Sequence, residues 1–354
     1  MALPWLAMTH GRCQSTLTEF ITPALTVLVG RKAKSEILRH WLTPSDRKNL
    51  TDPHGQVYMW PDADTKSHAA PLVHIDYELQ TYSSAQWTSP SGHGSSVGRT
   101  FKSYPGTLGP LIRRKLNNLL CARALGALSH TLCYFAADLG GPRAVAALIA
   151  QQVVLDPALD LPSRSLPRIL VVVDTSARRF DCAAAKATLV QAIGELMRTQ
   201  HGFHETGDSA ARIALHYRAI CVLGISRRAG VRQRSSLVRR KMTAMVKEVE
   251  TSRTAEGVLF DTEHLFAIVG KLLDHLSATS SVTCSLISLS RPEGFTVADL
   301  ETHAKEMFAL LPSEIWLWHL AAPLISSSII LPNYPPSAHG KSRESPLRTP
   351  AEVV

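Results

Sequence analysis

Residues 168–174 read RILVVVD and form the most strand-like stretch of the chain. An unbroken apolar run that is rich in β-branched residues and ends at an acidic residue is typical of a strand buried on both faces. Downstream, apolar residues recur at the spacing of one helix face, at Leu189, Ile193, Leu196 and Met197. The pattern therefore predicts a strand and then a helix.

Similar pairs of a strand and a helix extend outward in both directions from this stretch. Other apolar runs stand at Leu25–Val29, Pro71–Tyr77, Thr131–Ala137 and Arg218–Ile225. The polar stretch from 45 to 70 has room for an edge strand around Val57–Trp60. Apolar strands joined by crossover helices need a parallel sheet with helices on both faces. The sequence predicts an α/β fold, a three-layer sandwich with a mostly parallel sheet and further helices at the C-terminal end.

The expected organisation is one α/β domain with flanking segments. Residues 1–24 form an N-terminal segment, and residues 25–290 form the domain. Residues from about 80 to 109 are rich in Ser, Gly and Thr and are too many for an ordinary connection, so a flexible insertion is expected there. Helical spacing continues over 291–331, whereas 332–354 is rich in Pro, Ser and charge and is expected to be a disordered tail.

Composition places the chain among globular proteins. Its 354 residues are 45% hydrophobic and 19% charged, which is enough to bury a sizeable core. The 6 cysteines include no C-x-x-C pair and the 15 histidines show no metal-ligand spacing, so we expect reduced, mostly buried thiols and no zinc site. The first residues lack the basic region of a signal peptide, and no apolar run reaches the roughly 20 residues of a spanning helix. A cytoplasmic protein without a transmembrane segment is expected.

The turn after the first predicted strand partly matches the phosphate-binding loop pattern G-x-x-x-x-G-K-[ST]. Residues 28–35 read LVGRKAKS, so glycine is absent from positions 28 and 33. Gly30 still gives one permissive residue, and Lys34 and Ser35 stand where the lysine and the Mg²⁺-binding hydroxyl belong. The stretch predicts a distorted loop that binds the phosphates of GTP or ATP weakly. The alternative is an ordinary turn from strand to helix whose basic residues are solvated.

Two acidic residues near strand ends are candidates to assist a metal ion. Asp76 lies at the end of the second apolar run, and Asp138 opens the sequence DLGG, which fits a D-x-x-G switch motif. We expect Ser35 and Asp76 to be the ligands of a Mg²⁺ ion that accompanies the nucleotide, with Asp138 assisting. The alternative for Asp138 is to cap the helix that follows it. Neither Asn nor Lys accompanies Asp174 where a guanine-reading N-K-x-D motif belongs, so specificity for guanine is not expected.

No catalytic residue is assigned, and two further motif matches are rejected. Gly94–Gly98 fits the nucleophile elbow G-x-S-x-G but has neither a strand before it nor a helix after it. Residues 340–342, which read GKS, stand in the Pro-rich tail, where Pro346 blocks a helix. We therefore expect little or no hydrolysis, and at most a weak nucleoside triphosphatase.

The net charge of +9 is concentrated in part in one segment. Between Ser226 and Lys247 the chain has no acidic residue and eight basic ones, which are Arg227, Arg228, Arg232, Arg234, Arg239, Arg240, Lys241 and Lys247. Nucleic acid is not expected as a partner, because stacking aromatics and a recognisable module are both absent from the segment. A solvated helix face is the simplest interpretation. Binding of a polyanion or of an anionic membrane surface through Arg227–Lys247 is the alternative.

Three separated groups of residues, in this order, resemble one family. They are Cys133–Gly141 (CYFAADLGG) with the alanine-rich stretch after it, Pro167–Val173 (PRILVVV), and Ala321-Ala322-Pro323 with Tyr334-Pro335-Pro336 and His339. On these residues the chain resembles the degenerate GTPase-like region that precedes the patatin-like phospholipase domain in large fungal proteins.

The resemblance implies a P-loop NTPase-like sheet with weakened motifs, in keeping with the losses around Gly30 and Asp174. It implies no hydrolase activity, because the chain lacks the nucleophile elbow and the glycine-rich oxyanion loop of patatins. The departure just after His339 implies a product without the downstream phospholipase domain. We therefore expect a degenerate nucleotide-binding regulatory module, with a nucleotide or a partner protein as its ligand. The alternative is a non-catalytic interaction scaffold that binds no nucleotide.

Overall fold

The computed structural model describes the residues that build one sheet and its covering helices. They are 22–49, 57–65, 70–77, 125–126, 128–155, 161–177, 179–201, 209–261 and 286–290, with single positions 264, 265, 268, 271, 302, 305, 306 and 309. The expected N-terminal segment 1–24 falls almost wholly outside these residues, as do the insertion 80–109 and the tail 332–354. The helical extension 291–331 is represented only by the last of the single positions.

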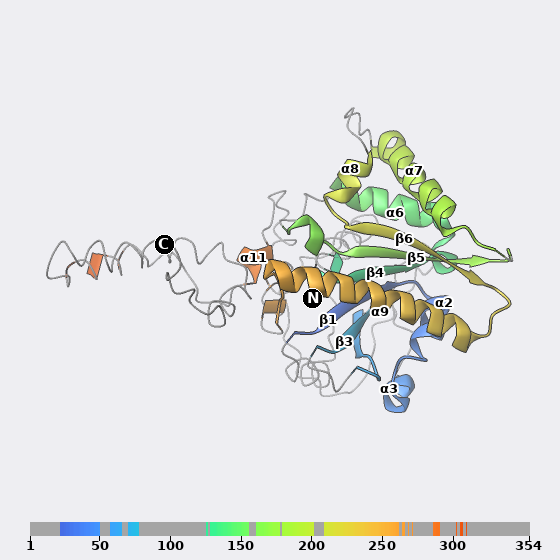
Figure 1. Cartoon of the computed structure of the whole chain (residues 1–354), viewed down its shortest axis with the longest axis horizontal. Coiled ribbons are helices and arrows are strands. Elements are labelled where there is room, and N and C mark those ends of the chain that lie inside the picture. Colours follow the sequence, from blue (N-terminus) through green and yellow to red (C-terminus); the bar gives the residue numbers. More distant parts are fainter. Residues whose placement is uncertain are drawn as a thin grey trace, which may run out of the picture.

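Six strands form one sheet in the order β2-β3-β1-β4-β5-β6 (Figure 1). The strands are β1 (Ala24–Val29), β2 (Val57–Pro61), β3 (Leu72–Tyr77), β4 (Thr131–Phe135), β5 (Arg168–Thr175) and β6 (Ala219–Ser226). Strand β2 pairs antiparallel with β3, and every other neighbouring pair is parallel. All of the predicted strands are present, and the weak pattern around Val57–Trp60 is an edge strand.

Alternate residues along each strand face opposite helical layers. The covering helices are α2 (Lys32–Leu38), α6 (Pro142–Leu155), α7 (Cys182–His201) and α9 (Val231–Glu256). In β5, Ile169 and Val171 pack in the same cluster as α6 and α7. The residues between them, Leu170 and Val172, pack with α2 and α9, which lie on the other side of the sheet (Figure 1). Burial of both faces explains the continuous apolar runs, and the predicted three-layer sandwich with a mostly parallel sheet is confirmed.

Several local details differ from expectation. The strand predicted to reach Ala137 ends at Phe135, because the next residues form the short helix α5 (Ala136–Leu139). Gly140 and Gly141 follow with φ of 93° and 101°, values that favour glycine, before α6 begins. The sequence pattern does not predict the shortest helical elements, which are α3 (Pro44–Asn49), η3 (Ser163–Ser165), α8 (Ser209–Ala214) and α11 (Leu286–Leu289).

The described part of the chain has three free cysteines and no helix suited to crossing a membrane. Cys133 is buried in β4, and burial raises its pKa, so it stays a protonated thiol. Cys221 is half-buried and Cys182 is exposed, so the expectation of mostly buried thiols is wrong for Cys182. Among the described helices, none combines the length and the apolar composition that a membrane span requires.

A buried arginine joins the end of α9 to the start of β4. Arg253 is 1% exposed, and its guanidinium donates to the main-chain carbonyls of Leu128 (3.0 Å), Ser129 (2.9 Å) and Ser165 (3.1 Å). Burial lowers the pKa of Arg253 to about 10, so the group is still charged at neutral pH. The last turn of α9 is thereby anchored to both the segment before β4 and η3.

Replacing Arg253 with Met should lower the free energy of unfolding by about 3 kcal/mol, because three buried carbonyls lose their donor while most of the side-chain volume remains. Equilibrium unfolding in urea measures the change. Arg240→Met, at an exposed position of the same helix, is the matched control and should cost less than about 0.5 kcal/mol. Equal losses in the two variants would contradict the role of Arg253 as an anchor.

Acid should destabilise the fold through His216, which is 4% exposed between α8 and β6. Burial and then the charge of Arg212 lower the pKa of His216 to about 4 from its usual value of 6.5. Between these two values the folded protein binds fewer protons than the unfolded chain, so stability is lost as the pH falls through this window. Urea unfolding at pH 7 and at about pH 4.5 should show an acid loss about 2 kcal/mol smaller in His216→Phe than in the wild type. An unchanged acid loss in the variant would refute this assignment.

Candidate functional site

The loops that follow β1 and β4 meet at the carboxyl edge of the sheet. These two strands are neighbours, yet α2 after β1 packs on one face and α6 after β4 packs on the other. In open α/β sheets, ligands bind at the point where neighbouring connections diverge in this way. The predicted site residues Gly30, Lys34 and Asp138 all lie on these two connections.

The carboxylate of Asp138 lies in the turn that begins α2. Its Oδ2 accepts hydrogen bonds from the backbone N–H groups of Arg31 (2.7 Å) and Lys34 (3.0 Å), and its Oδ1 accepts one from that of Ala33 (2.9 Å). Arg31, the residue before α2, supplies no capping side chain of its own. Because the first N–H groups of a helix have no partner within it, these three are free to point at one anion. We call these three N–H groups the amide cradle.

The cap that Asp138 forms differs from the cap that the sequence offers as the alternative role of this residue. The expected cap was on the helix after Asp138, whereas the carboxylate caps α2, whose residues lie 104 to 107 positions earlier. Both carboxylate oxygens accept N–H donors, and a role of Asp138 beside Mg²⁺ stays a prediction. No local pattern connects residue 138 with residues 31–34, because their contact depends on the pairing of β1 with β4.

Gly30 provides the space in which the Asp138 carboxylate lies. A Cβ atom at position 30 would be 2.7 Å from Asp138 Oδ2 and 3.0 Å from Phe135 Cβ, closer than side chains normally pack. The glycine that the sequence offers as a permissive residue of a phosphate loop is therefore required here for a close approach of the Asp138 side chain to the backbone.

Lys34 and Asp76 form a buried ion pair next to the cradle. Both side chains are fully buried, and Lys34 Nζ lies 2.5 Å from Asp76 Oδ1. The ammonium group also donates to the carbonyl oxygen of Tyr77 at 3.2 Å. Asp76 Oδ2 is buried without a hydrogen-bond partner among the described residues. Loss of either member of the pair would leave a buried charge, which is costly in a protein interior.

Ser35 and Asp76 are the predicted ligands of a magnesium ion. Ser35 is half-buried in the first turn of α2, one residue after Lys34. Within the described ranges, no group of three or more His, Cys, Asp or Glu side chains is arranged to hold a metal ion. The hydroxyl and carboxylate oxygens are of the kind that Mg²⁺ takes, and Mg²⁺ usually completes its coordination with water and substrate phosphates. The residue types fit such a shared ion, and its protein ligands stay a prediction.

The carboxyl edge of the sheet carries exposed positive charge. Arg31 and Lys32 are exposed where α2 begins, and Arg227 and Arg228 are exposed in the turn after β6. Exposed cations attract anions from solution, and Arg31 and Lys32 are the pair at the cradle, because β6 is three strands away from β1 in the sheet. The rim of the site therefore favours an anionic ligand.

The basic segment 226–247 is solvated only in part. Six of its eight basic residues are exposed, as the simplest interpretation predicts. Arg234 instead pairs with Asp174 at 2.9 Å, and Arg239 contacts the carboxylates of Asp62 and Asp64. These two arginines hold α9 against the sheet and belong to the fold rather than to a surface for polyanions.

A second polar cluster, which the sequence does not reveal, is buried between β1, β3 and α9. His74 Nδ1 lies 2.8 Å from Thr26 Oγ1, and His74 Nε2 lies 3.1 Å from Asp62 Oδ2. Burial would raise the pKa of Asp62, but hydrogen bonds and charges from His74 and Arg239 bring it below its usual value, whereas burial lowers the pKa of His74. Hydroxyl, imidazole and carboxylate follow one another as in a hydrolytic triad. All three groups are fully buried, so the cluster braces the core and exposes no nucleophile.

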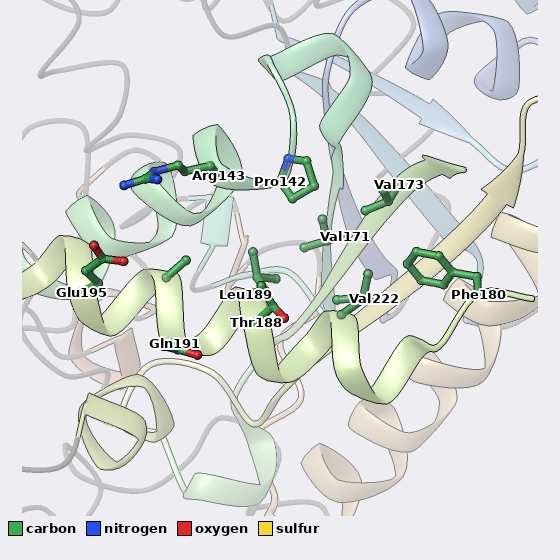
Figure 2. Close-up of a pocket in the computed structure, with 12 residues that line it drawn as sticks. Pro142, Arg143, Val171, Val173, Phe180, Thr188, Leu189, Gln191, Glu195 and Val222 are labelled. Carbon is green, nitrogen blue, oxygen red and sulfur yellow. The ribbon is translucent and has the colours of Figure 1, made fainter. Parts of the chain in front are cut away.

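An apolar cavity of about 500 Å³ lies between α6, α7 and the strands β5 and β6 (Figure 2). Its floor is formed by Val171, Val173 and Val222, and Phe180 lies at one end. The Phe180 ring lies over β6 because Gly224 has no side chain, since a Cβ there would be 2.3 Å from the ring. None of the predicted site residues lines this cavity. The sequence gives no sign of it, because its apolar floor belongs to ordinary strand and helix faces and its polar lining residues, Arg143, Thr188, Gln191 and Glu195, follow no motif.

No protein-family model matches the chain, and no curated protein sequence matches it either. The ligand of the site is therefore inferred from the geometry of the cradle, the buried ion pair and the charged rim.

Replacing Gly30 with Ala should lower the free energy of unfolding by about 2 kcal/mol, because the new methyl group overlaps the Asp138 carboxylate. Urea unfolding of the full chain measures the loss. Gly230→Ala is the matched control, since a Cβ before α9 meets nothing within 4 Å, and it should change stability by less than about 0.5 kcal/mol. In combination with Asp138→Ala, the Gly30→Ala substitution should cost less than it does alone, and strict additivity would contradict the contact.

Proposed function

We propose that the chain is a degenerate nucleotide-binding regulatory module of P-loop NTPase-like fold, which binds the phosphates of GTP or ATP at the amide cradle with little or no hydrolysis. The observation that carries the proposal is that three backbone N–H groups after β1 converge on one anionic group. Convergent backbone amides at the start of a helix are how phosphate-binding loops hold their ligand.

The side chains around the cradle support a phosphate ligand. Lys34 stands where a phosphate-binding lysine belongs, and its backbone N–H is part of the cradle, whereas its ammonium group is paired with Asp76. Ser35 and Asp76 would hold the Mg²⁺ ion, which would neutralise phosphate charge. The exposed Arg31 and Lys32 add positive charge at the entrance.

The nucleotide base is not expected to be selected. Asp174 lies near the end of β5, where a guanine-reading aspartate would stand, and Arg234 Nη2 donates to its Oδ1 at 2.9 Å. The Asn and Lys residues that accompany such an aspartate in a guanine-reading motif are also absent from the sequence. Both GTP and ATP are therefore candidate ligands.

Binding without turnover is proposed because the sequence has no recognisable residue that would orient an attacking water. Nucleotide-dependent switches use such a residue for hydrolysis. The resemblance of Cys133–Gly141 and Pro167–Val173 to the GTPase-like region of fungal patatin-like phospholipase proteins supports a regulatory role over a catalytic one. A bound nucleotide would then act by changing the shape of the carboxyl edge.

A scaffold that binds no nucleotide is the second candidate, and one observation favours it. The cradle already holds the Asp138 carboxylate, and the Lys34 ammonium group is already paired with Asp76. Charged groups that are already paired with one another can serve to stabilise the fold without binding a ligand.

Titration of the full chain with fluorescent, non-hydrolysable GTP and ATP analogues and Mg²⁺ separates these candidates. We expect weak, saturable binding of both analogues, and at least about tenfold weaker binding by Lys34→Ala, because a charge-assisted contact to phosphate is lost. The double variant Lys34→Met/Asp76→Leu removes the pair without leaving an unpaired buried charge. It should bind at least as weakly as Lys34→Ala, because it also removes a proposed ligand of the Mg²⁺ ion.

Lys32→Ala is the matched control, since it removes the same charge from an exposed position two residues earlier. It should weaken binding by less than about threefold, as expected for a screened surface charge. Absence of a saturable signal with either analogue would favour the scaffold and contradict nucleotide binding.

A further inference from the structure

Helix α9 carries a line of exposed basic residues on the side that faces away from the sheet. Its buried residues, from Ser235 to Arg253, recur at the spacing of one helix face and turn that face toward the strands. On the outer side, exposed residues recur at steps of three or four, at Arg232, Ser236, Arg240, Thr243 and Lys247. We call the three basic members, Arg232, Arg240 and Lys247, the basic row. At the rise of an α-helix, the row extends over about 22 Å.

The charge of the basic row is not balanced by acidic side chains of the fold. From Val231 to Lys247 the helix contains no acidic residue. The next residue, Glu248, pairs with Arg168 of β5. In the part of the chain that the structure describes, no member of the row has an ion-pair partner. The three charges are therefore available to a partner from outside the chain.

Positive charge also surrounds the row, whereas the opposite helical layer is mixed. Arg227 and Arg228 are exposed just before α9, and Lys241 is exposed on the helix itself. Along α7, on the other side of the sheet, exposed basic and acidic residues are interspersed, at Lys186, Glu195 and Arg198. Positive charge that is gathered on one face creates a field that favours an anionic partner at that face.

The chemistry of this face fits a layer of anionic phospholipid headgroups. Such a layer attracts nearby Lys and Arg through its negative surface potential and requires no shaped pocket. Helix α9 crosses the outside of the sheet as one long helix, so its outer side chains can approach a single plane (Figure 1).

An exposed hydrophobic side chain favours lipid over nucleic acid. Val231 is exposed at the first position of α9, directly beside Arg232. Surfaces that bind the membrane interface combine basic residues with apolar ones, which reach the acyl chains below the headgroups. Binding of single-stranded nucleic acid commonly uses aromatic side chains on which bases stack, and the segment 226–247 has none.

We propose that the outer face of α9 is a membrane-docking surface, which holds the protein by electrostatic attraction against a bilayer that contains anionic phospholipids. The basic row makes the central contact, and Arg227 and Arg228 extend it. The helix lies on the headgroups instead of inserting, because its outer side chains are charged or carry hydroxyl groups. The amide cradle and the Lys34–Asp76 pair contribute no group to this surface, so docking goes beyond the proposed function and does not depend on it.

The test is co-sedimentation of the full chain with phosphatidylcholine vesicles, with and without about 30% phosphatidylserine, at about 0.1 M salt. The wild type should sediment with the anionic vesicles and not with the neutral ones. The triple variant Arg232→Gln, Arg240→Gln and Lys247→Gln should bind at least about tenfold more weakly, because each basic side chain near the bilayer adds to the attraction. The triple variant Arg232→Lys, Arg240→Lys and Lys247→Arg should stay within about threefold of the wild type, because the charge is retained.

The matched control removes the same charge from α6 and α7, through Arg143→Gln, Lys186→Gln and Arg198→Gln at exposed positions. It should weaken binding by less than about threefold, because these charges lie on the other side of the sheet. Urea unfolding of both glutamine variants checks that substitutions at exposed positions leave the fold intact.

Equal losses in the two glutamine variants would show an effect of net charge alone and would overturn the docking surface. Failure to sediment with the anionic vesicles, or equal sedimentation with the neutral ones, would overturn it as well. Binding to a duplex DNA oligonucleotide without binding to the anionic vesicles would assign the face to nucleic acid instead. A rise in salt to about 1 M should release the protein, since screening then acts within about 3 Å, and binding that persists would contradict an electrostatic contact.

Discussion

The pairing of β1 with β4 is the constraint on which the site depends, and the two strands are tied at both ends. At their start, the Leu25 N–H donates to His130 Nδ1 at 3.1 Å, and the His130 N–H donates to the Leu25 carbonyl at 2.7 Å. Burial and then the charge of Arg253 lower the pKa of His130 well below its usual value, so the ring stays neutral and can accept this bond. At their carboxyl end, Asp138 accepts the three N–H groups of the amide cradle. Without this pairing the loop after β1 and the carboxylate after β4 would not meet.

The electrostatics of the site follow from where its charges can reach water. In the interior each cation described at this edge faces a carboxylate, as Lys34 faces Asp76 and Arg234 faces Asp174. At the rim, Arg31 and Lys32 are exposed. The exposed rim therefore attracts anions from solution, whereas the charges inside the site are already paired.

The fold could be predicted from the sequence because burial on both sheet faces leaves unbroken apolar runs, such as residues 168–174. The candidate residues could be named for a related reason, since Gly30, Lys34, Asp76 and Asp138 follow or end such runs, and the ends of parallel strands share one edge. Their contacts could not be predicted. The Asp138 contact spans 104 to 107 positions, and the partners of His74, which stands inside an apolar run, depend on the β2–β3 register. Sequence spacing carries no information about such pairings.

The helix that begins at the cradle has a consequence for the order of folding. Helix α2 is 7 residues long, whereas an isolated helix needs about 12–15 residues to be even marginally stable in water. The group that completes its first turn is supplied only after β4 has been made. During synthesis, the cap of α2 can therefore form only after the middle of the chain has left the ribosome. Contacts of such large sequence separation form slowly, so we expect the first turn of α2 to become ordered only after β1 and β4 have paired.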